Sequence, residues 1–180
     1  MLVSKMSEAL IVEFVNTNDL LAEADGFAAP EDLVAWLSER GLTRADARAG
    51  AVELAAAKEL REGLRCLLLR NNGIEDGCTD AWACVERAAD DGHLVLRFDA
   101  GVPRMRPAAE GVRGALGAIV AAVQESVLEG GFQRIKACRC RDCEWAFIDT
   151  SKNRSRAWCS MKVCGNREKA RAFRARERDS

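Results

Sequence analysis

The sequence predicts an α+β fold in which a mostly helical body with a few short strands is followed by a small C-terminal unit. Three observations lead to this prediction. Apolar residues recur at helical spacing in several segments of the first 131 residues, two segments have the composition or alternation of strands, and two evenly spaced cysteine pairs fall in the last third of the chain. We expect the body to span residues 1–131 and the C-terminal unit to span residues 132–180.

The first segments of the body are assigned from composition and from helix-end signals. Residues 9–17, which read ALIVEFVNT, are rich in β-branched and aromatic residues and are predicted to form a strand. A helix is expected to begin at Pro30, since proline and acidic residues favour the first turn, and to end at Gly41. Its apolar stripe is expected to consist of Leu33, Trp36 and Leu37.

Two further helices are predicted from capping residues and apolar periodicity. Thr43 is expected to cap a helix that runs toward Arg70, and Thr79 is expected to cap another that continues through Ala89. The apolar residues expected to face inward are Val52, Ala56, Leu60, Leu64 and Leu67 in the first helix and Trp82 and Val85 in the second.

A strand and a long helix are predicted for the end of the body. Residues 93–99 alternate as a strand does, and Gly101 is expected to turn the chain toward residues 104–106. A helix is expected over residues 111–128 and is ended by Gly130. Its apolar side comprises Leu116, Ile119, Val120 and Val123.

Charge is distributed unevenly along the chain. The formal net charge is −1, yet residues 133–180 contain 14 Lys and Arg against 6 Asp and Glu, whereas the preceding residues contain 13 against 22. This asymmetry indicates a basic appendage on an acidic body, an arrangement that favours nucleic-acid binding.

The sequence has no recognisable targeting or membrane-spanning segment. Glu8 and Glu13 interrupt the apolar run near the first residue, and no segment approaches the ~18 apolar residues that would span a bilayer. We therefore expect a cytoplasmic protein with no membrane partner and with reduced cysteines. Eight reduced cysteines favour a metal site or a redox role over a disulfide framework.

Two cysteine pairs have the spacing of a zinc site. Four residues separate Cys138 from Cys143, four separate Cys159 from Cys164, and the 15 residues between the pairs are long enough to form a hairpin. Four thiolates complete the tetrahedral coordination of one Zn²⁺ and leave no position for water or substrate, so the metal is expected to be structural. Cys140 also forms a Cys-x2-Cys pair with Cys143, but we favour Cys138 because its spacing matches that of the second pair.

No pattern typical of an enzyme accompanies these cysteines. The sequence contains no glycine-rich phosphate loop and no paired carboxylate signature. Asp149 has no neighbouring nucleophile or open metal position, and we expect it to hold an arginine of the basic loop that follows it. We therefore predict that the protein is not an enzyme.

A basic helix is predicted after Cys164. At 100° per residue, four of its arginines fall within a stripe about 60° wide, whereas Ala170 and Phe173 lie to one side and are expected to dock toward the zinc core. Guanidinium groups crowded on one face suit phosphates, and the two arginines nearest the helix start are expected to approach base edges. The candidate nucleic-acid-binding residues are Arg167, Arg171, Arg174 and Arg178 in the stripe, Lys169 on the opposite side, and Lys152, Arg154 and Arg156 in the preceding loop.

These C-terminal motifs resemble the CGNR zinc finger family. The matching positions are Cys143-x-Trp-x-Phe-x-Asp, Asn153-x2-Arg156-x-Trp158-Cys159-x-Met161 and Cys164-Gly165-Asn166-Arg167-x-Lys169, within residues 138–172. In that family the finger follows an N-terminal ABATE domain of α+β character, and Phe14-Val15-Asn16-Thr17 resembles the start of such a domain. The resemblance implies a bacterial transcription regulator that binds DNA through a treble-clef-like hairpin and helix and reads a stress-related signal through its body.

Three functions are compatible with the sequence. In the first, the body senses a small-molecule ligand or forms a homodimer while the finger binds duplex DNA. In the second, the protein is an interaction module whose basic helix docks on an acidic partner surface or on its own acidic body. In the third, it binds RNA and stacks bases on Trp145 or Trp158. DNA binding predicts that both tryptophans are buried near zinc, whereas RNA binding predicts that at least one ring is exposed beside the arginines.

Overall fold

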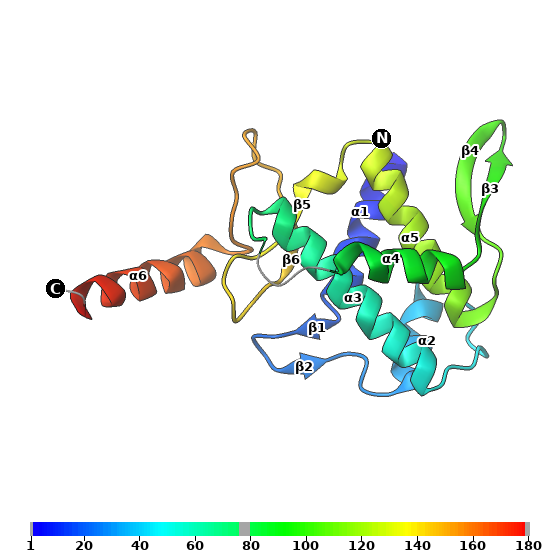
Figure 1. Cartoon of the computed structure of the whole chain (residues 1–180), viewed down its shortest axis with the longest axis horizontal. Helices are drawn as coiled ribbons and strands as arrows, with labels where there is room; N and C mark the ends of the chain where they lie inside the picture. Colours follow the sequence, from blue (N-terminus) through cyan, green and yellow to red (C-terminus); the bar gives the residue numbers. More distant parts are fainter. Residues whose placement is uncertain (1, 76–79, 179–180) are drawn as a thin grey trace.

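The computed structural model describes residues 2–75 and 80–178 and confirms the α+β fold. A helical body occupies one end of the molecule, and the last helix projects away from it at the other end (Figure 1). The elements of the body are α1 (Leu2–Val15), β1 (Asn18–Asp19), β2 (Ala24–Asp25), α2 (Pro30–Glu39), α3 (Ala51–Asn71), α4 (Ala81–Asp91), β3 (Leu94–Asp99), β4 (Val102–Pro107) and α5 (Gly111–Leu128). They are followed by the 3₁₀ turn η1 (Phe132–Arg134), β5 (Ile135–Ala137), β6 (Ala146–Ile148), the π-helical turn η2 (Met161–Gly165) and α6 (Asn166–Arg178).

The strands of the described chain form three separate antiparallel hairpins, β1–β2, β3–β4 and β5–β6. The predicted hairpin after residue 93 is confirmed as β3–β4, which is paired from Leu94↔Pro107 to Asp99↔Val102. In Figure 1 this hairpin lies at the opposite end of the molecule from α6.

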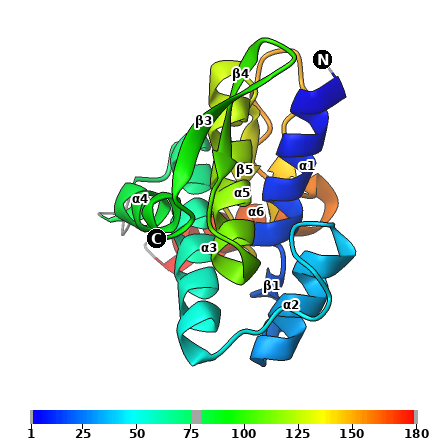
Figure 2. The ribbon, with the colours of Figure 1, turned by 90° about the vertical axis from the view of Figure 1, so that its right-hand side faces the viewer.

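Helix α5 lies between α1 and α3 at the centre of the body, and α4 packs against α3 and α5 (Figure 2). Leu64 of α3 and Ile119 of α5 are fully buried in this core. An aromatic cluster joins α1 to α2: the rings of Phe14 in α1, Phe27 in the loop before α2 and Trp36 in α2 have centroids 5.6 to 6.0 Å apart. The apolar faces that residue spacing predicts for α2 and α5 therefore pack into the core.

The first predicted element is wrong, because residues 9–17 lie mostly in α1 and not in a strand. Ser7, Ile11, Phe14 and Val15 are buried, and their spacing places them on one face of a helix. This face packs against α5, α3 and β6. Strand propensity largely measures how well a residue fits a half-buried surface, so helix packing that buries the same side chains overrides it.

Helix α3 begins at Ala51 and not after the predicted cap Thr43. Gly50 occupies the N-cap position, and its amide donates to Glu53 Oε2 at 3.0 Å, which satisfies a donor at the helix start. Val52 consequently lies in the first turn and is 70% exposed, contrary to its predicted inward position. The rest of the predicted face does point inward: Leu60, Leu64 and Leu67 are buried and Ala56 is half-buried.

Helix α4 confirms one of its two predicted core residues. Val85 is buried, but Trp82 is 47% exposed and packs beside Phe132 with ring centroids 6.5 Å apart. Trp82 lies in the first turn of α4 and Phe132 in η1, so this contact joins the body to the start of the C-terminal unit. The predicted cap Thr79 lies outside the described residues.

Helix α5 is long and apolar enough to span a membrane by length and composition, which the sequence estimate overlooked. No other helix in the described ranges meets that criterion. In the folded protein 56% of the segment is buried inside the body. Its apolar composition is therefore accounted for by its central position in the core.

The β5–β6 hairpin joins the core of the body. Ile135 and Ala137 of β5 and Ala146 of β6 are buried in the same apolar cluster as the body helices. Asn72, which follows the last turn of α3, donates from Nδ2 to the carbonyls of Ala137 and Ala157 at 2.7 and 2.8 Å. The body and the start of the C-terminal unit thus share one packed interior.

Candidate metal centre and basic surface

Four cysteine sulfurs converge beside the β5–β6 hairpin. Cys138 follows β5, and Cys143 ends a tight turn in which its amide donates to the carbonyl of Cys140 at 2.9 Å. Cys159 lies in the loop after β6, and Cys164 lies in η2. All four Sγ atoms lie within 4.8 Å of one another. The hairpin therefore encloses the first cysteine pair, whereas the sequence placed a hairpin between the two pairs.

The sulfur geometry fits a tetrahedral zinc ion. The Sγ atom of Cys159 lies 3.5 Å from that of Cys143 and 3.7 Å from that of Cys164. A zinc–sulfur bond of about 2.3 Å in a tetrahedron requires sulfurs about 3.8 Å apart. Cys138, Cys143 and Cys164 are buried and Cys159 is half-buried, so the donor set is closed and purely thiolate. Such a set suits a structural metal.

Cys140 is fully buried, but its sulfur is not part of the converging group. Burial raises the pKa of the Cys140 thiol above its ordinary value, which favours the neutral form. The geometry therefore favours Cys138 over Cys140 as the first donor.

The four converging thiols perturb one another. A hydrogen bond from Cys143 lowers the pKa of Cys138 to about 5, and the same hydrogen bond raises the pKa of Cys143. Burial raises the pKa of Cys164 to about 12. Crowded thiolates repel one another, so it takes a bound cation to stabilise four of them together.

A buried ion pair supports the loop between β6 and Cys159. Asp149 is fully buried and accepts from Lys136 Nζ at 2.7 Å and from the amide of Arg156 at 3.0 Å. Burial opposes ionisation of Asp149, but hydrogen bonds from Lys136 and Ser151 outweigh it and hold its pKa well below the usual range. Asp149 therefore holds the basic loop, as expected, but through the backbone of Arg156 and not through a guanidinium.

The structural role of Lys136 was not identified from the sequence, because the residue pattern around it gives only a weak signal. Lys136 is a single cation between the apolar residues of a three-residue strand, paired with Phe147 across the hairpin. It is 5% exposed, and its Nζ also donates to the carbonyls of Arg154 and Arg156 at 2.6 and 3.2 Å. A lysine that neutralises Asp149 and binds two loop carbonyls serves to fix the backbone.

The predicted basic helix is confirmed as α6, and none of its described residues is buried. Phe173 is 57% exposed and Ala170 is exposed, so the prediction that they dock toward the zinc core is wrong. Helix α6 projects away from the rest of the molecule (Figure 1). Its apolar side chains therefore have no neighbouring surface to pack against.

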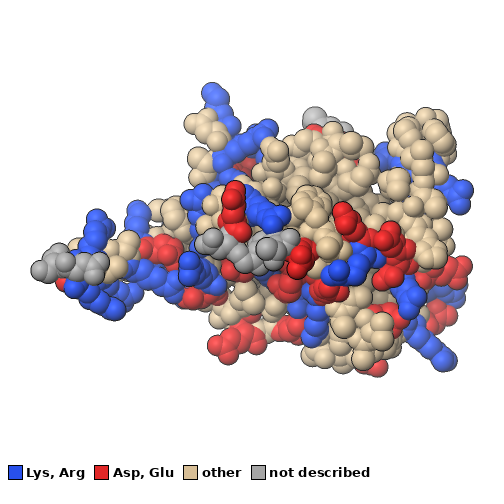
Figure 3. All heavy atoms as spheres, viewed as in Figure 1, with Lys and Arg blue, Asp and Glu red and all other residues tan. Residues whose placement is uncertain are grey.

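The predicted DNA-binding residues gather at the finger end of the molecule. Lys and Arg side chains dominate this end in the space-filling view, whereas the body shows a mixture of both signs (Figure 3). Arg171 forms ion pairs with Asp142 and Glu168, and the Arg156 side chain folds over the Phe147 ring. The remaining predicted residues, all exposed, are Lys152, Arg154, Arg167, Lys169, Arg174 and Arg178.

Both finger tryptophans are half-buried and pack against the cysteine cluster. The Trp158 Nε1 atom is buried without a hydrogen-bond partner among the described residues. Neither ring has the full exposure that a base-stacking platform requires. They lie beside the sulfurs, as the DNA-binding hypothesis predicts, but they are half-buried and not fully buried.

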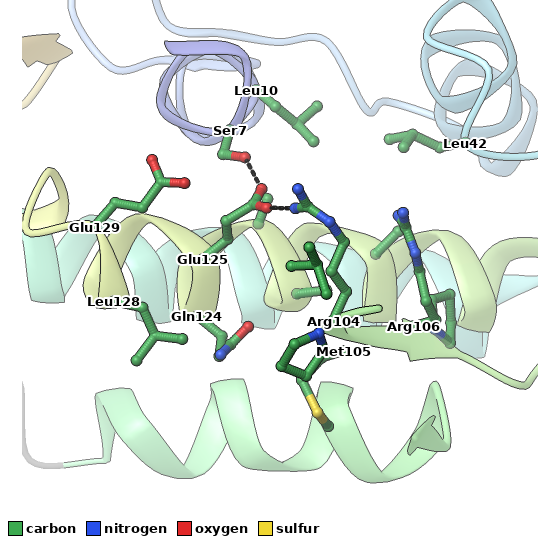
Figure 4. Close-up of a pocket in the computed structure, with 16 residues that line it drawn as sticks. Ser7, Leu10, Leu42, Arg104, Met105, Arg106, Gln124, Glu125, Leu128 and Glu129 are labelled. Carbon is green, nitrogen blue, oxygen red and sulfur yellow. Dashed lines mark hydrogen bonds and ion pairs between the residues drawn. The ribbon is translucent and has the colours of Figure 1, made fainter. Parts of the chain in front are cut away.

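The body contains a cleft of about 550 Å³ between α1, β4 and α5 (Figure 4). Leu10 and Leu128 contribute apolar surface to it. On its polar side Glu125 forms an ion pair with Arg104 and accepts from Ser7 Oγ at 2.7 Å. The volume lies within the range of small-molecule sites, which is roughly 300–1,000 Å³.

Comparison with protein families gives two matches that together cover most of the chain. Residues 8–131 match the model of the ABATE family, described as "Putative stress-induced transcription regulator". Residues 134–177 match the CGNR zinc finger model. Comparison with curated proteins gives no match. The finger model and the four converging thiols together identify a site for one structural zinc ion.

Proposed function

We propose that this chain, which belongs to the ABATE family and ends in a CGNR zinc finger, is a transcription regulator that binds duplex DNA through the finger. In this proposal Cys138, Cys143, Cys159 and Cys164 are the ligands of the single structural Zn²⁺. The metal contributes folding free energy by tying together two loops that have few apolar residues of their own. It presents no open coordination position, so we propose no enzymatic activity.

The single observation that carries the proposal is the unburied basic helix α6. Its sequence has six Lys and Arg against two Glu, and none of its described residues is buried. A helix of this length is marginal in water without packing, so a binding partner should stabilise it. The partner must be anionic and must accept a helix about 10–12 Å wide, which matches the major groove of B-DNA at about 12 Å.

The stripe residues are assigned roles by their position along α6. Arg167 lies in the first turn, next to the zinc site, and is proposed to approach base edges together with Arg171. Arg171 can reach a base only by leaving Asp142 and Glu168, so its ion pairs reduce its contribution. Arg174, Arg178 and the loop cations are proposed to bind phosphates.

The body is proposed to sense a small molecule or to mediate homodimer formation. The cleft beside α5 is the described feature that supports ligand binding, because it combines apolar walls with a few fixed polar groups. The exposed apolar residues Phe98 and Val102 near the tip of the β3–β4 hairpin support self-association.

Measurement of duplex affinity against salt concentration tests the DNA-binding proposal. Each neutralised phosphate contributes a slope of roughly −0.9, so four stripe contacts with two or three loop contacts predict a slope of about −5 to −6. A wild-type protein that carries zinc but shows no salt-sensitive affinity for duplex would refute the proposal. Binding to an acidic protein instead would support the interaction module, and preference for single-stranded RNA would support the RNA-binding alternative.

A further inference from the structure

A basic hollow lies where the end of α3 meets the loop of the zinc finger. It has a volume of about 330 Å³. The described residues that line it are three cations and two amide side chains, with no carboxylate among them: Arg70, Asn71, Gln133, Lys136 and Arg154. Arg70 and Asn71 come from the body, whereas the other three come from the C-terminal unit.

The finger side of this hollow is fixed by the buried ion pair beneath it. Lys136 Nζ donates to the carbonyl of Arg154 at 2.6 Å, and the charge of Lys136 is balanced by Asp149. Arg154 has a φ of 53°, a left-handed conformation that few residues other than glycine adopt. Lys136 therefore holds a strained backbone that presents the exposed Arg154 side chain at the rim of the hollow, and such strain concentrates at functional sites.

The body side is fixed to the finger by hydrogen bonds to the backbone. Asn71 Nδ2 donates to the carbonyls of Phe132 and Ile135 at 2.8 and 3.0 Å. Arg70, in the last turn of α3, is thereby held at a constant position relative to the finger. Cations from the two parts of the chain thus face one hollow without the need for a hinge movement.

We infer that this hollow binds a backbone phosphate of duplex DNA, so that the body and the finger hold the duplex together. The inference rests on the proposed function and assigns a DNA contact to the body. A tetrahedral anion can accept from the guanidinium groups of Arg70 and Arg154 and from the Gln133 amide, the donor types that bind phosphates. DNA is the favoured source of the phosphate because the elements that line the hollow, at the end of α3 and in the basic loop, lie toward the same end of the molecule as α6 (Figure 1).

Two variants test the inference by lowering the positive charge of the hollow in different ways, one by truncating a side chain and one by keeping its shape. Arg70→Ala removes the cation of the body and should weaken duplex binding roughly three- to tenfold while making the salt slope shallower by about 0.9. Gln133→Glu keeps the shape but places a carboxylate 3.5 Å from Arg154 Nη1, the present separation of the Gln133 oxygen, and should weaken binding at least as much. Arg70→Lys should retain most of the affinity.

Arg97→Ala is the matched control, since Arg97 is an exposed arginine on β3 at the other end of the molecule. It should leave both affinity and salt slope unchanged. All variants should keep one zinc per chain and the melting temperature of the wild type, which excludes loss of folding as the cause.

The outcomes separate this inference from the proposed function. Wild-type duplex binding that Arg70→Ala and Gln133→Glu leave unchanged would overturn the inference alone. Absence of salt-sensitive duplex binding by the wild type would overturn the proposed function and the assignment of the hollow to DNA with it. A calorimetric titration with inorganic phosphate covers the other source: saturable binding that Arg70→Ala abolishes, with duplex affinity unaltered, would assign the hollow to a free phosphate and overturn the inference.

Discussion

Asn16 and Ala146 are joined by two reciprocal hydrogen bonds: Asn16 Nδ2 donates to the Ala146 carbonyl at 3.0 Å, and the Ala146 amide donates to Asn16 Oδ1 at 2.7 Å. The Asn16 side chain, directly after α1, thus pairs with the backbone of β6 as a neighbouring strand would. These two bonds satisfy the backbone amide and carbonyl of Ala146, which is buried. Folding of the body and folding of the finger hairpin are coupled through this contact.

Replacement of Asn16 should destabilise the whole chain. Asn16→Ala leaves the amide and carbonyl of Ala146 without these partners, at an expected cost of about 1–3 kcal/mol in the free energy of unfolding. Urea denaturation followed by circular dichroism measures the loss. Asn153→Ala, at an exposed loop position, is the control and should change stability by less than about 0.5 kcal/mol. Equal stability of the two variants would show that the contact does not couple the parts.

The zinc-ligand assignment predicts the metal content of cysteine variants. Purified wild-type protein should contain about one zinc per chain, because four thiolates bind one tetrahedral ion. Cys138→Ser, Cys159→Ser and Cys164→Ser should lose the metal and unfold the finger, whereas Cys140→Ser should retain it. Elemental analysis of the purified variants measures the difference. Retention of zinc by Cys138→Ser together with its loss from Cys140→Ser would show that Cys140, and not Cys138, is the first ligand.

The body is proposed to fold without the finger, but with reduced stability. A chain that ends at Gly131 lacks Ile135 and Ala137, which are fully buried, and leaves Asn72 Nδ2 without its two carbonyl acceptors. Its thermal transition should remain cooperative but move to lower temperature than that of a chain that ends at Thr150 and retains the β5–β6 hairpin. An aggregated product from the shorter chain would show that residues 1–131 are not an independent folding unit.

The Lys136–Asp149 pair should behave as a coupled unit. Asp149→Asn leaves the Lys136 ammonium buried without a counter-charge and should cost about 3 kcal/mol or more. The double variant Lys136→Met, Asp149→Asn should lose less than the sum of the single losses, because no unpaired charge remains. Chemical denaturation at pH 7 measures all three variants. Additive losses would show that the two groups do not interact.

The same pair predicts how stability depends on pH. Because the pKa of folded Asp149 lies below its usual range, its stabilising contribution is complete above the unfolded-state pKa of about 3.9 and is lost as the pH falls below that value. The stability difference between the wild type and Asp149→Asn should be constant from pH 8 to pH 5 and should shrink in more acidic solution. A difference that grows on acidification would contradict the low pKa.

The arginines of α6 should differ in what they contribute. Arg174→Ala with Arg178→Ala should make the salt slope shallower by nearly two and leave sequence preference intact, because phosphate contacts carry no sequence information. Arg167→Ala should cost about 1–3 kcal/mol on the preferred duplex and less on random DNA if it contacts a base edge. Fluorescence anisotropy with both duplexes distinguishes the two effects. Equal losses of affinity for both duplexes after Arg167→Ala would show that Arg167 contacts a phosphate and not a base edge.

Local patterns in the sequence were sufficient for the elements whose signals lie within a few residues. The spacing of Cys159 and Cys164 matched that of Cys138 and Cys143, and the four sulfurs converge. The apolar period of residues 111–128 identified α5, and the alternation after residue 93 identified the β3–β4 hairpin. These signals are local because helix and strand periods are properties of the backbone.

Only the tertiary structure decided the features that depend on what a segment packs against. Residues 9–17 have strand composition, yet they form α1 because α5 offers a surface that buries a helical face. Phe173 resembles a core residue in the sequence but is exposed, because α6 projects beyond the surface it was expected to cover. Lys136 and Asp149 carry no mutual signal in the sequence, and they become an ion pair only when β5 and the loop after β6 exclude water from both. The sequence by itself determined periodicity, ligand spacing and the sign of charge, whereas burial, which depends on distant residues, was decided by the fold.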